Sequence, residues 1–317
     1  MVSPRYFQAD QGILYMTGKA KGTIYALVCV ALWGLIPVVA KLGQSSLDNH
    51  QFLFWSSLVS FLVLTSNAAI SGKLREIKTY SFKDWFFISF LGLLGTYSYY
   101  LFLYLGYAQA KGLEVLVIQY TWPIIIVVLS YFILKEKLDY RKITALFLGF
   151  LGVVTVLTKG EFDQINVSNP SVIALVGTGA ICFALFSVLS KSVLAKNVKK
   201  STVVIVSLYF LTALIASFIS MLYFSEFSTP TASEITPILI NGILVNGYSY
   251  IFWVKALQAT EASYLAPFTF IAPILSAVYL IMIFNEPVVI AYGLGLTLIV
   301  IGGLINSIRD KKLGTSA

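Results

Sequence analysis

Long apolar runs separated by short polar stretches occupy almost the whole chain, and they predict helices that cross a membrane. A helical crossing of the hydrocarbon core needs about 20 apolar residues. Ten runs approach or exceed that length, at 22–42, 51–70, 85–108, 112–134, 142–158, 171–195, 202–224, 237–257, 262–284 and 287–308. The fold class predicted by this pattern is an all-α polytopic membrane protein with ten transmembrane helices.

The basic residues support this count, because they fall almost entirely on one side of the predicted membrane. Lysine and arginine collect in the cytoplasmic loops of membrane proteins. With the N-terminus inside, all 22 lysine and arginine residues lie in cytoplasmic segments except Lys41, Lys111 and Lys159. We therefore expect both termini to be cytoplasmic.

Composition agrees with this interpretation and narrows the chemistry. Only 11% of the 317 residues are charged, against roughly 25% in soluble domains. The cytoplasmic loops account for the net charge of +8, so we expect the lipid bilayer and no nucleic acid as a partner. The lone histidine, His50, and two cysteines in apolar runs, Cys29 and Cys182, are too few for the usual metal or His-based catalytic sites. We expect no metal and no cofactor.

The two halves of the chain resemble each other at a constant shift of 150 residues, as from Pro123 to Pro273. The same shift pairs 33–41 with 183–191, Glu136 with Glu286, and Gly152 with Gly302. Because five spans are an odd number, the second half enters the membrane in the opposite direction, which makes an inverted repeat. Inverted repeats of this kind are common in secondary transporters.

The repeat divides the predicted chain into five parts. We expect a cytoplasmic N-terminal tail at 1–21, a first repeat of helices 1–5 at 22–158, an external linker at 159–170, a second repeat of helices 6–10 at 171–308, and a cytoplasmic C-terminal tail at 309–317.

Prolines at the middle of spans 4 and 9 predict broken helices at matching positions in the two halves. Pro123 and Pro273 lack an N–H and so free the carbonyls of Gln119 and Thr269, which need partners in a medium without water. Neighbouring helices or a polar cavity could supply them. Matching interruptions mark substrate sites in transporters, so we predict helix breaks and gating at both prolines.

Aromatic and polar residues near these breaks are the candidate substrate-binding residues. Tyr97, Tyr100, Tyr104 and Tyr107 follow a spacing that puts them on one helical face. Glu114 lies one turn from the outer end of span 4. A carboxylate there is either an interfacial group without a ligand or a partner for an ammonium group of the substrate. The complete set of candidates is Trp33, Tyr97, Tyr100, Glu114, Gln119, Tyr120, Trp122, Tyr248, Tyr264 and Phe268.

Several of these features together resemble the EamA-domain branch of the drug/metabolite transporter superfamily, over residues 20 to 308. They are ten spans, a five-plus-five repeat, the opening Ala31-Leu32-Trp33-Gly34, and the paired prolines and glutamates. The segment from Glu114 to Pro123 is similar to one in bacterial inner-membrane exporters of aromatic and other amino acids, with Gln119 where an asparagine is expected. The resemblance implies a bacterial or archaeal inner membrane and a basket in which spans 5 and 10 pack to one side of a central cavity.

We therefore expect a secondary transporter that exports amino acids or similar small amphiphilic metabolites across the plasma membrane by alternating access. An exporter of cationic drugs or quaternary ammonium compounds is the alternative. A membrane-embedded enzyme would need an intramembrane acid, base or metal cluster. A receptor of the retinal type would need a lysine at mid-depth in the membrane. Neither is found in the sequence, so we expect no enzyme. A monomer satisfies the pattern, which does not determine the oligomeric state.

Overall fold

The computed structural model describes residues 5–43, 47–107, 109–110, 112–165, 170–196 and 200–308, and in this part of the chain every regular element is helical. Ten segments of these residues are long and apolar enough to cross a membrane, which confirms the predicted number. Lys111, part of the linker expected at 159–170 and the tail expected at 309–317 lie outside the described residues.

Five of the ten spans contain a change of helix type or a break. The spans are, in order, α1 and α2 (Arg5–Trp33, Ile36–Gly43); α3 (Asn49–Ile70); α4, η2 and α5 (Phe82–Gly92, Leu93–Ser98, Tyr99–Tyr107); α6 and α7 (Gly112–Gln119, Trp122–Ile133); α8 (Tyr140–Leu157); α9 (Pro170–Lys196); α10 (Thr202–Phe224); α11, η4 and α12 (Ala232–Ile240, Asn241–Tyr248, Ser249–Ala259); α13, η5 and α14 (Ala262–Leu265, Ala266–Ile271, Ala272–Phe284); and α15 (Ile290–Ser307). Two short 3-10 helices, η1 (Leu74–Thr79) and η3 (Phe162–Gln164), lie in loops.

Spans 3 and 8 begin with the same local signal and change helix type at the same depth. A capping box opens α4, where Ser81 and Asp84 satisfy each other's backbone N–H groups, and another opens α11 at Thr231 and Glu234. Each span then passes through a π-helix, η2 or η4. Both pairs of features are related by the shift of 150 residues, and π-helical turns occur frequently at functional sites.

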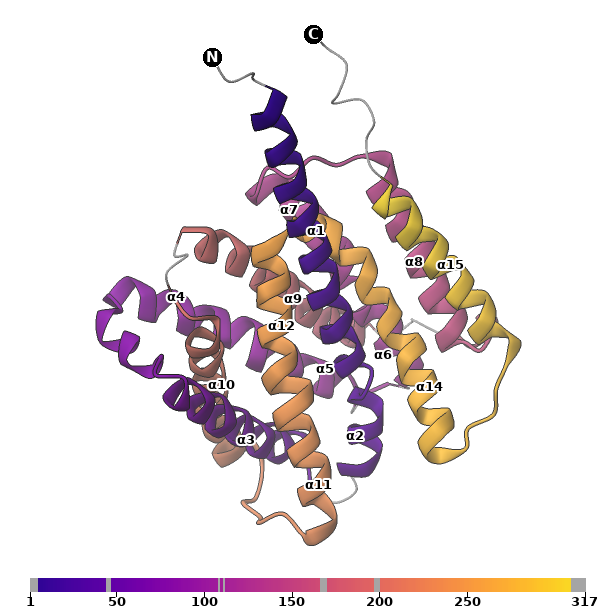
Figure 1. Ribbon diagram of the computed structural model, residues 1–317. Coiled ribbons are helices and arrows are strands. Elements are labelled where there is room, and N and C mark those ends of the chain that lie inside the picture. The colour runs from indigo at the N-terminus through magenta and orange to yellow at the C-terminus, as the bar shows by residue number, and fades with distance from the viewer. Residues whose placement is uncertain are drawn as a thin grey trace.

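The two halves pack crosswise, because most close helix pairs join one repeat to the other. Along the bundle α1 packs on α12, α3 on α10, and α5 and α7 on α9. The pair formed by α8 and α15 lies on one side of the molecule (Figure 1). This is the placement expected for spans 5 and 10, and it leaves the other spans to surround the centre.

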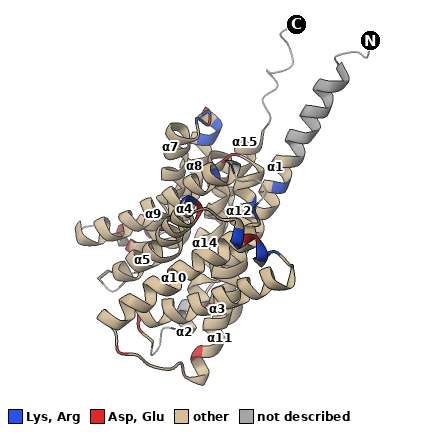
Figure 2. Ribbon diagram, turned by 90° about the vertical axis from the view of Figure 1, so that its left-hand side faces the viewer, with Lys and Arg blue, Asp and Glu red and all other residues tan. Residues whose placement is uncertain are grey.

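The start of α1 and the end of α15 lie at the same end of the bundle, which we call the terminal end (Figure 1). Most of the described lysine and arginine residues lie in the half of the molecule toward this end (Figure 2). The other end, which includes α2 and α11, is called the opposite end. The distribution agrees with the charge pattern of the sequence.

Small residues allow α8 and α15 to approach closely, and this contact gives a first prediction. A Cβ atom added to Gly295 would lie 2.4 Å from Val156 Cγ2 and 2.7 Å from the carbonyl oxygen of Gly152, whereas one added to Gly293 would meet nothing within 4 Å. We expect Gly295→Ala to lower the free energy of unfolding by about 1–3 kcal/mol, because the helices must separate. Gly293→Ala on the same helix should leave it unchanged. Thermal unfolding in detergent measures both variants, and equal losses would contradict the proposed cause.

Candidate functional site

A cavity of about 430 Å³ lies between the two repeats. Its lining residues come from seven of the ten spans: Trp33, Ile36, Pro37, Val39, Phe52, Tyr99, Tyr100, Leu103, Tyr104, Tyr107, Leu116, Gln119, Tyr120, Trp122, Phe183, Asn241, Thr269, Ala272 and Ser276. In spans 1, 3 and 4 these residues belong to the half of the span nearer the opposite end. The cavity therefore extends from mid-depth toward the opposite end, and its volume is in the range of small-molecule sites.

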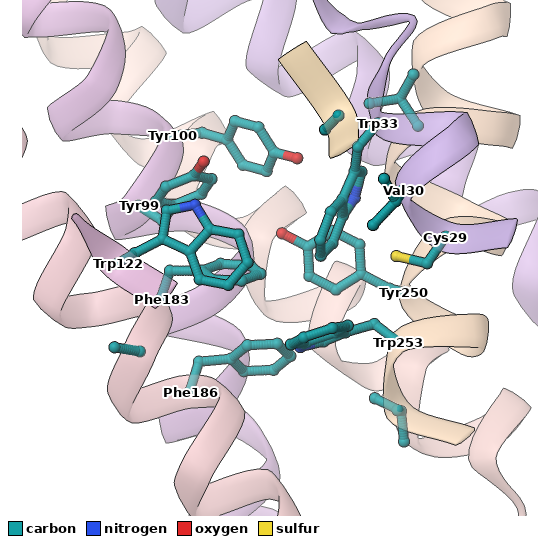
Figure 3. Packing of buried hydrophobic residues seen from close by; sticks show 14 of the residues in the cluster. Cys29, Val30, Trp33, Tyr99, Tyr100, Trp122, Phe183, Phe186, Tyr250 and Trp253 are labelled. Atoms are coloured by element: carbon teal, nitrogen blue, oxygen red, sulfur yellow. The ribbon is translucent and has the colours of Figure 1, made fainter. Parts of the chain in front are cut away.

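A buried group of aromatic rings closes the cavity on the side of the terminal end. We call it the aromatic cluster, and it comprises Trp33, Trp122, Phe183, Phe186, Tyr250 and Trp253 (Figure 3). The centroid of the Trp33 ring lies 5.4 Å from that of Trp253 and 5.6 Å from that of Phe183. The rings of Trp122 and Phe183 are 4.9 Å apart and close to perpendicular. Such edge-to-face packing is favourable beyond area burial, so these residues form a floor beneath the cavity.

The polar groups that face the cavity are uncharged. No lysine, arginine, aspartate or glutamate is among the lining residues in the described part of the chain. Gln119 Nε2 donates a hydrogen bond to Tyr99 Oη, and Asn241 Nδ2 donates one of 3.0 Å to Ser56 Oγ. Gln119 is only 7% exposed, and its Oε1 atom accepts no hydrogen bond from the described residues. A buried acceptor without a partner is costly, so it marks a place where a ligand or water donor would be stabilised.

The two prolines lie where the helices of spans 4 and 9 are interrupted. Pro123 is the second residue of α7, four residues after α6 has ended at Gln119. Pro273 is in the first turn of α14, directly after the 3-10 segment η5. The lining residues Gln119, Tyr120, Trp122, Thr269 and Ala272 all lie within four residues of these prolines. Both interruptions therefore border the cavity.

Half of the candidate substrate-binding residues are brought together by the structure. Trp33, Tyr100, Gln119, Tyr120 and Trp122 line the cavity. The other five are not among its lining residues.

Three of those five pack elsewhere with identified partners. Tyr248 Oη accepts a hydrogen bond of 3.1 Å from Asn67 Nδ2. Tyr264 and Phe268 pack edge to face with ring centroids 5.3 Å apart. Tyr264 Oη is 3.2 Å from Thr23 Oγ1, and this contact joins span 9 to span 1 near the terminal end.

Tyr97 and Glu114 are not among the lining residues, although each is two residues away in sequence from one that is. Glu114 is in the first turn of α6 and is partly exposed. Tyr97 lies inside the π-helix η2 and is half-buried. A π-helical turn contains an extra residue, so it rotates the positions before it relative to those after it. Tyr97 is therefore turned relative to α5, in which Tyr99, Tyr100, Tyr104 and Tyr107 line the cavity.

Several lining residues were not among the candidates predicted from the sequence. They differ in whether the sequence contained a pattern that could have indicated them. Phe183 corresponds to Trp33 at the shift of 150 residues, so the repeat itself could have indicated it. Asn241 is an amide inside an apolar run, which is a detectable signal. Phe52 and Ser276 have no distinctive pattern around them.

A ten-span helical protein with a mid-depth cavity between two inverted halves has the architecture of a secondary transporter. The sequence pattern of the EamA-like transporter family matches residues 20–158 and again residues 170–308. The chain belongs to the EamA-like transporter family. It is accordingly a multi-pass protein of the plasma membrane, with a small molecule as its substrate.

Individual relatives are distant, although they cover nearly the whole chain. A protein of Clostridium kluyveri named as an uncharacterized transporter is 24% identical, over 92% of this chain and 94% of its own. One named S-adenosylmethionine uptake transporter, from Rickettsia prowazekii, is also 24% identical, over 84% of this chain and 85% of its own. A solved crystal structure superimposes with a TM-score of 0.80 at 19% identity, over 93% of this chain and 99% of that one. This last similarity concerns the fold.

Proposed function

We propose that the protein is a secondary transporter that exports amino acids or similar small amphiphilic metabolites by alternating access. The observation that carries the proposal is the cavity, which combines an aromatic floor with uncharged amide and hydroxyl groups. Aromatic walls suit an apolar side chain, and the amides and tyrosine hydroxyls can hold a polar head group. Trp33, Tyr100, Gln119, Tyr120 and Trp122 would make these contacts, and rocking of the repeats about the prolines would expose the site to each side.

Orientation and domain organisation belong to the same proposal. The terminal end would face the cytoplasm, because the basic loops lie there. The repeats at 22–158 and 171–308 would then be joined outside the cell. In this orientation the cavity extends toward the exterior and the aromatic cluster separates it from the cytoplasm. We propose no catalytic step for the protein.

A cationic drug or quaternary ammonium compound is the second candidate substrate. Ring faces attract cations, and the aromatic content of the cavity favours this class. S-adenosylmethionine, which the name of the Rickettsia prowazekii relative gives as that protein's substrate, is both an amino acid and a cation. That relative is named for uptake, so flux must be measured in both directions.

Flux into and out of proteoliposomes tests the proposal. Saturable transport of amino acids is expected, and Gln119→Ala should reduce it at least tenfold, because a charge-assisted hydrogen bond from a substrate ammonium group to Oε1 contributes about 1.5–3 kcal/mol. Gln258→Ala is the matched control, since Gln258 is exposed near the terminal end. Flux of cationic compounds without amino-acid flux would favour the second candidate. Equal flux in wild type and Gln119→Ala would exclude Gln119 from the site.

A further inference from the structure

A buried carboxylate, that of Glu136, joins the two repeats at the terminal end. Glu136 follows α7 in the first repeat and is 7% exposed. Its Oε1 accepts a hydrogen bond of 2.9 Å from Ala262 N, and its Oε2 accepts bonds of 2.8 Å and 2.6 Å from the backbone N and Oγ of Ser263. These donors form the N-terminus of α13, where span 9 of the second repeat begins.

Two lysines extend this contact. Lys142 Nζ donates hydrogen bonds of 2.8 Å to Glu261 Oε2 and 2.8 Å to Ser263 Oγ, which also joins the first repeat to the second. Lys191 Nζ, at the end of α9, is 4.0 Å from Glu136 Oε1. We call Glu136, Lys142, Lys191 and Ser263 the terminal latch. It closes the end of the bundle that the aromatic cluster also closes.

The physical strength of the terminal latch comes from the helix end. The first N–H groups of a helix have no partner within the helix, and they carry a partial positive charge that attracts a carboxylate. Charge-assisted hydrogen bonds in a buried setting are among the stronger ones. Separation of the repeats here would expose both the carboxylate and the N–H groups, so the terminal latch favours a closed terminal end.

The repeat places equivalent groups at the opposite end. The shift of 150 residues pairs Glu136 with Glu286, Lys191 with Lys41, Ala262 with Gly112, and Ser263 with Leu113. The backbone before each carboxylate matches as well, since Lys135 and Asn285 have φ angles of 57° and 56°. Gly112 is the first residue of α6, as Ala262 is of α13. The opposite end thus has a carboxylate on a matching turn and a helix N-terminus for it to cap.

We propose that Glu136 and Glu286 are alternating latches of the transport cycle, a role that rests on the alternating access proposed above. Glu136 caps α13 and holds the terminal end closed in the conformation described here. Glu286 caps α6 at Gly112 and Leu113 and holds the opposite end closed in the other conformation. Each carboxylate therefore stabilises one conformation and not the other, which biases the equilibrium between them.

The two latches differ at two positions. Ser263 supplies a hydroxyl donor to Glu136, whereas Leu113 at the equivalent position has none. Lys142 bonds Ser263 and Glu261, whereas the shift of 150 residues places Tyr292 at its equivalent position. The terminal latch therefore has more polar contacts. This difference favours the conformation that is closed at the terminal end, and Ser263→Ala should remove part of the preference.

Distances between spin labels on the purified full-length protein in lipid nanodiscs test the proposal. One pair of labels, at Lys137 and Gln258, reports on the terminal end, and another, at Gln109 and Val288, on the opposite end. All four positions are exposed. Cys29 and Cys182 are replaced by alanine in every sample, and thermal unfolding confirms that each variant is folded.

Glu136→Gln and Glu286→Gln should shift the populations in opposite directions. Loss of the charge should change the ratio of the two conformations, closed at the terminal end or closed at the opposite end, about tenfold or more. Glu136→Gln should lengthen the distance at the terminal end and shorten it at the opposite end, and Glu286→Gln should do the reverse. Ser263→Ala should shift the ratio a few-fold in the direction of Glu136→Gln. Glu226→Gln, on the exposed surface of the opposite end, is the control and should leave both distances unchanged.

The outcomes separate the two proposals. Two populations in the wild type that both glutamate variants leave unchanged, or shift in the same direction, would overturn the latches and leave alternating access intact. A single unchanging distance at both ends, in the wild type and in every variant, with or without a transported amino acid, would overturn alternating access and the latches together.

Discussion

Replacement of Trp122 by alanine is expected to reduce the initial rate of substrate flux into proteoliposomes at least tenfold. Trp122 is 4% exposed, lines the cavity and contacts the rings of Trp33, Phe183 and Trp253 with centroid separations of 4.9 to 6.0 Å. Its removal takes away an apolar wall for the substrate and opens a void in the floor of the cavity. Buried aromatic anchors of this kind dominate binding energies.

The stability cost must be separated from the effect on transport. Removal of a buried tryptophan costs about 3–5 kcal/mol of stability, so Trp122→Phe, which keeps a ring, should recover most of the flux. Trp55→Ala is the matched control, because Trp55 is partly exposed at the opposite end, where its Nε1 donates to the carbonyl of Ser228. If Trp122→Ala and Trp55→Ala transport equally well at equal amounts of folded protein, Trp122 does not belong to the substrate site.

Gly95→Ala is expected to be the most damaging small substitution in the bundle, with a loss of about 3 kcal/mol or more in the free energy of unfolding. The added Cβ would lie 2.2 Å from Cγ of Phe186, the ring carbon attached to Cβ, so the whole ring must shift to make room. Phe186 is fully buried, so the ring has no free space to enter. The carbonyl of Gly95 also accepts a hydrogen bond of 2.7 Å from Tyr250 Oη, and displacement of η2 would break it.

A double-mutant cycle tests the assigned cause. Phe186→Leu makes room for the new methyl group, so Gly95→Ala should cost less in that background than in the wild type. Gly177→Ala in α9 is the control, because a Cβ there meets nothing within 4 Å. Additive losses in the cycle would show that the contact with Phe186 is not the reason for the damage.

The fold could be predicted from the sequence because its signals are long and repeated. Each span is a run of about 20 residues, and the shift of 150 residues relates positions in several spans. Errors of a few residues at the ends of a span do not change such a pattern. The number of spans and the two halves follow from it, and the side position of α8 and α15 was implied by the family resemblance.

The individual residues around the cavity were less predictable, because the direction in which a side chain points depends on the local helix geometry. A regular helix would put Tyr97 on the face of Tyr100 and Tyr104, whereas the π-helix η2 turns it relative to α5, and Tyr97 is not among the lining residues. The helix propensities of the amino acids do not predict where a π-helical turn occurs. Tyr264 lies two residues after the start of span 9 and is therefore near the terminal end, and Phe268 packs against it one turn later.

The crosswise pairing of the two halves has a consequence for biosynthesis. The partner of α1 is α12, and the partner of α3 is α10, so the earliest helices to leave the ribosome have their main neighbours in the second half of the chain. Until the second half has been inserted, glycine-lined surfaces such as that of α8 are covered only by lipid. The first five helices can enter the membrane one by one, whereas their tertiary assembly must wait until synthesis of the chain is nearly complete.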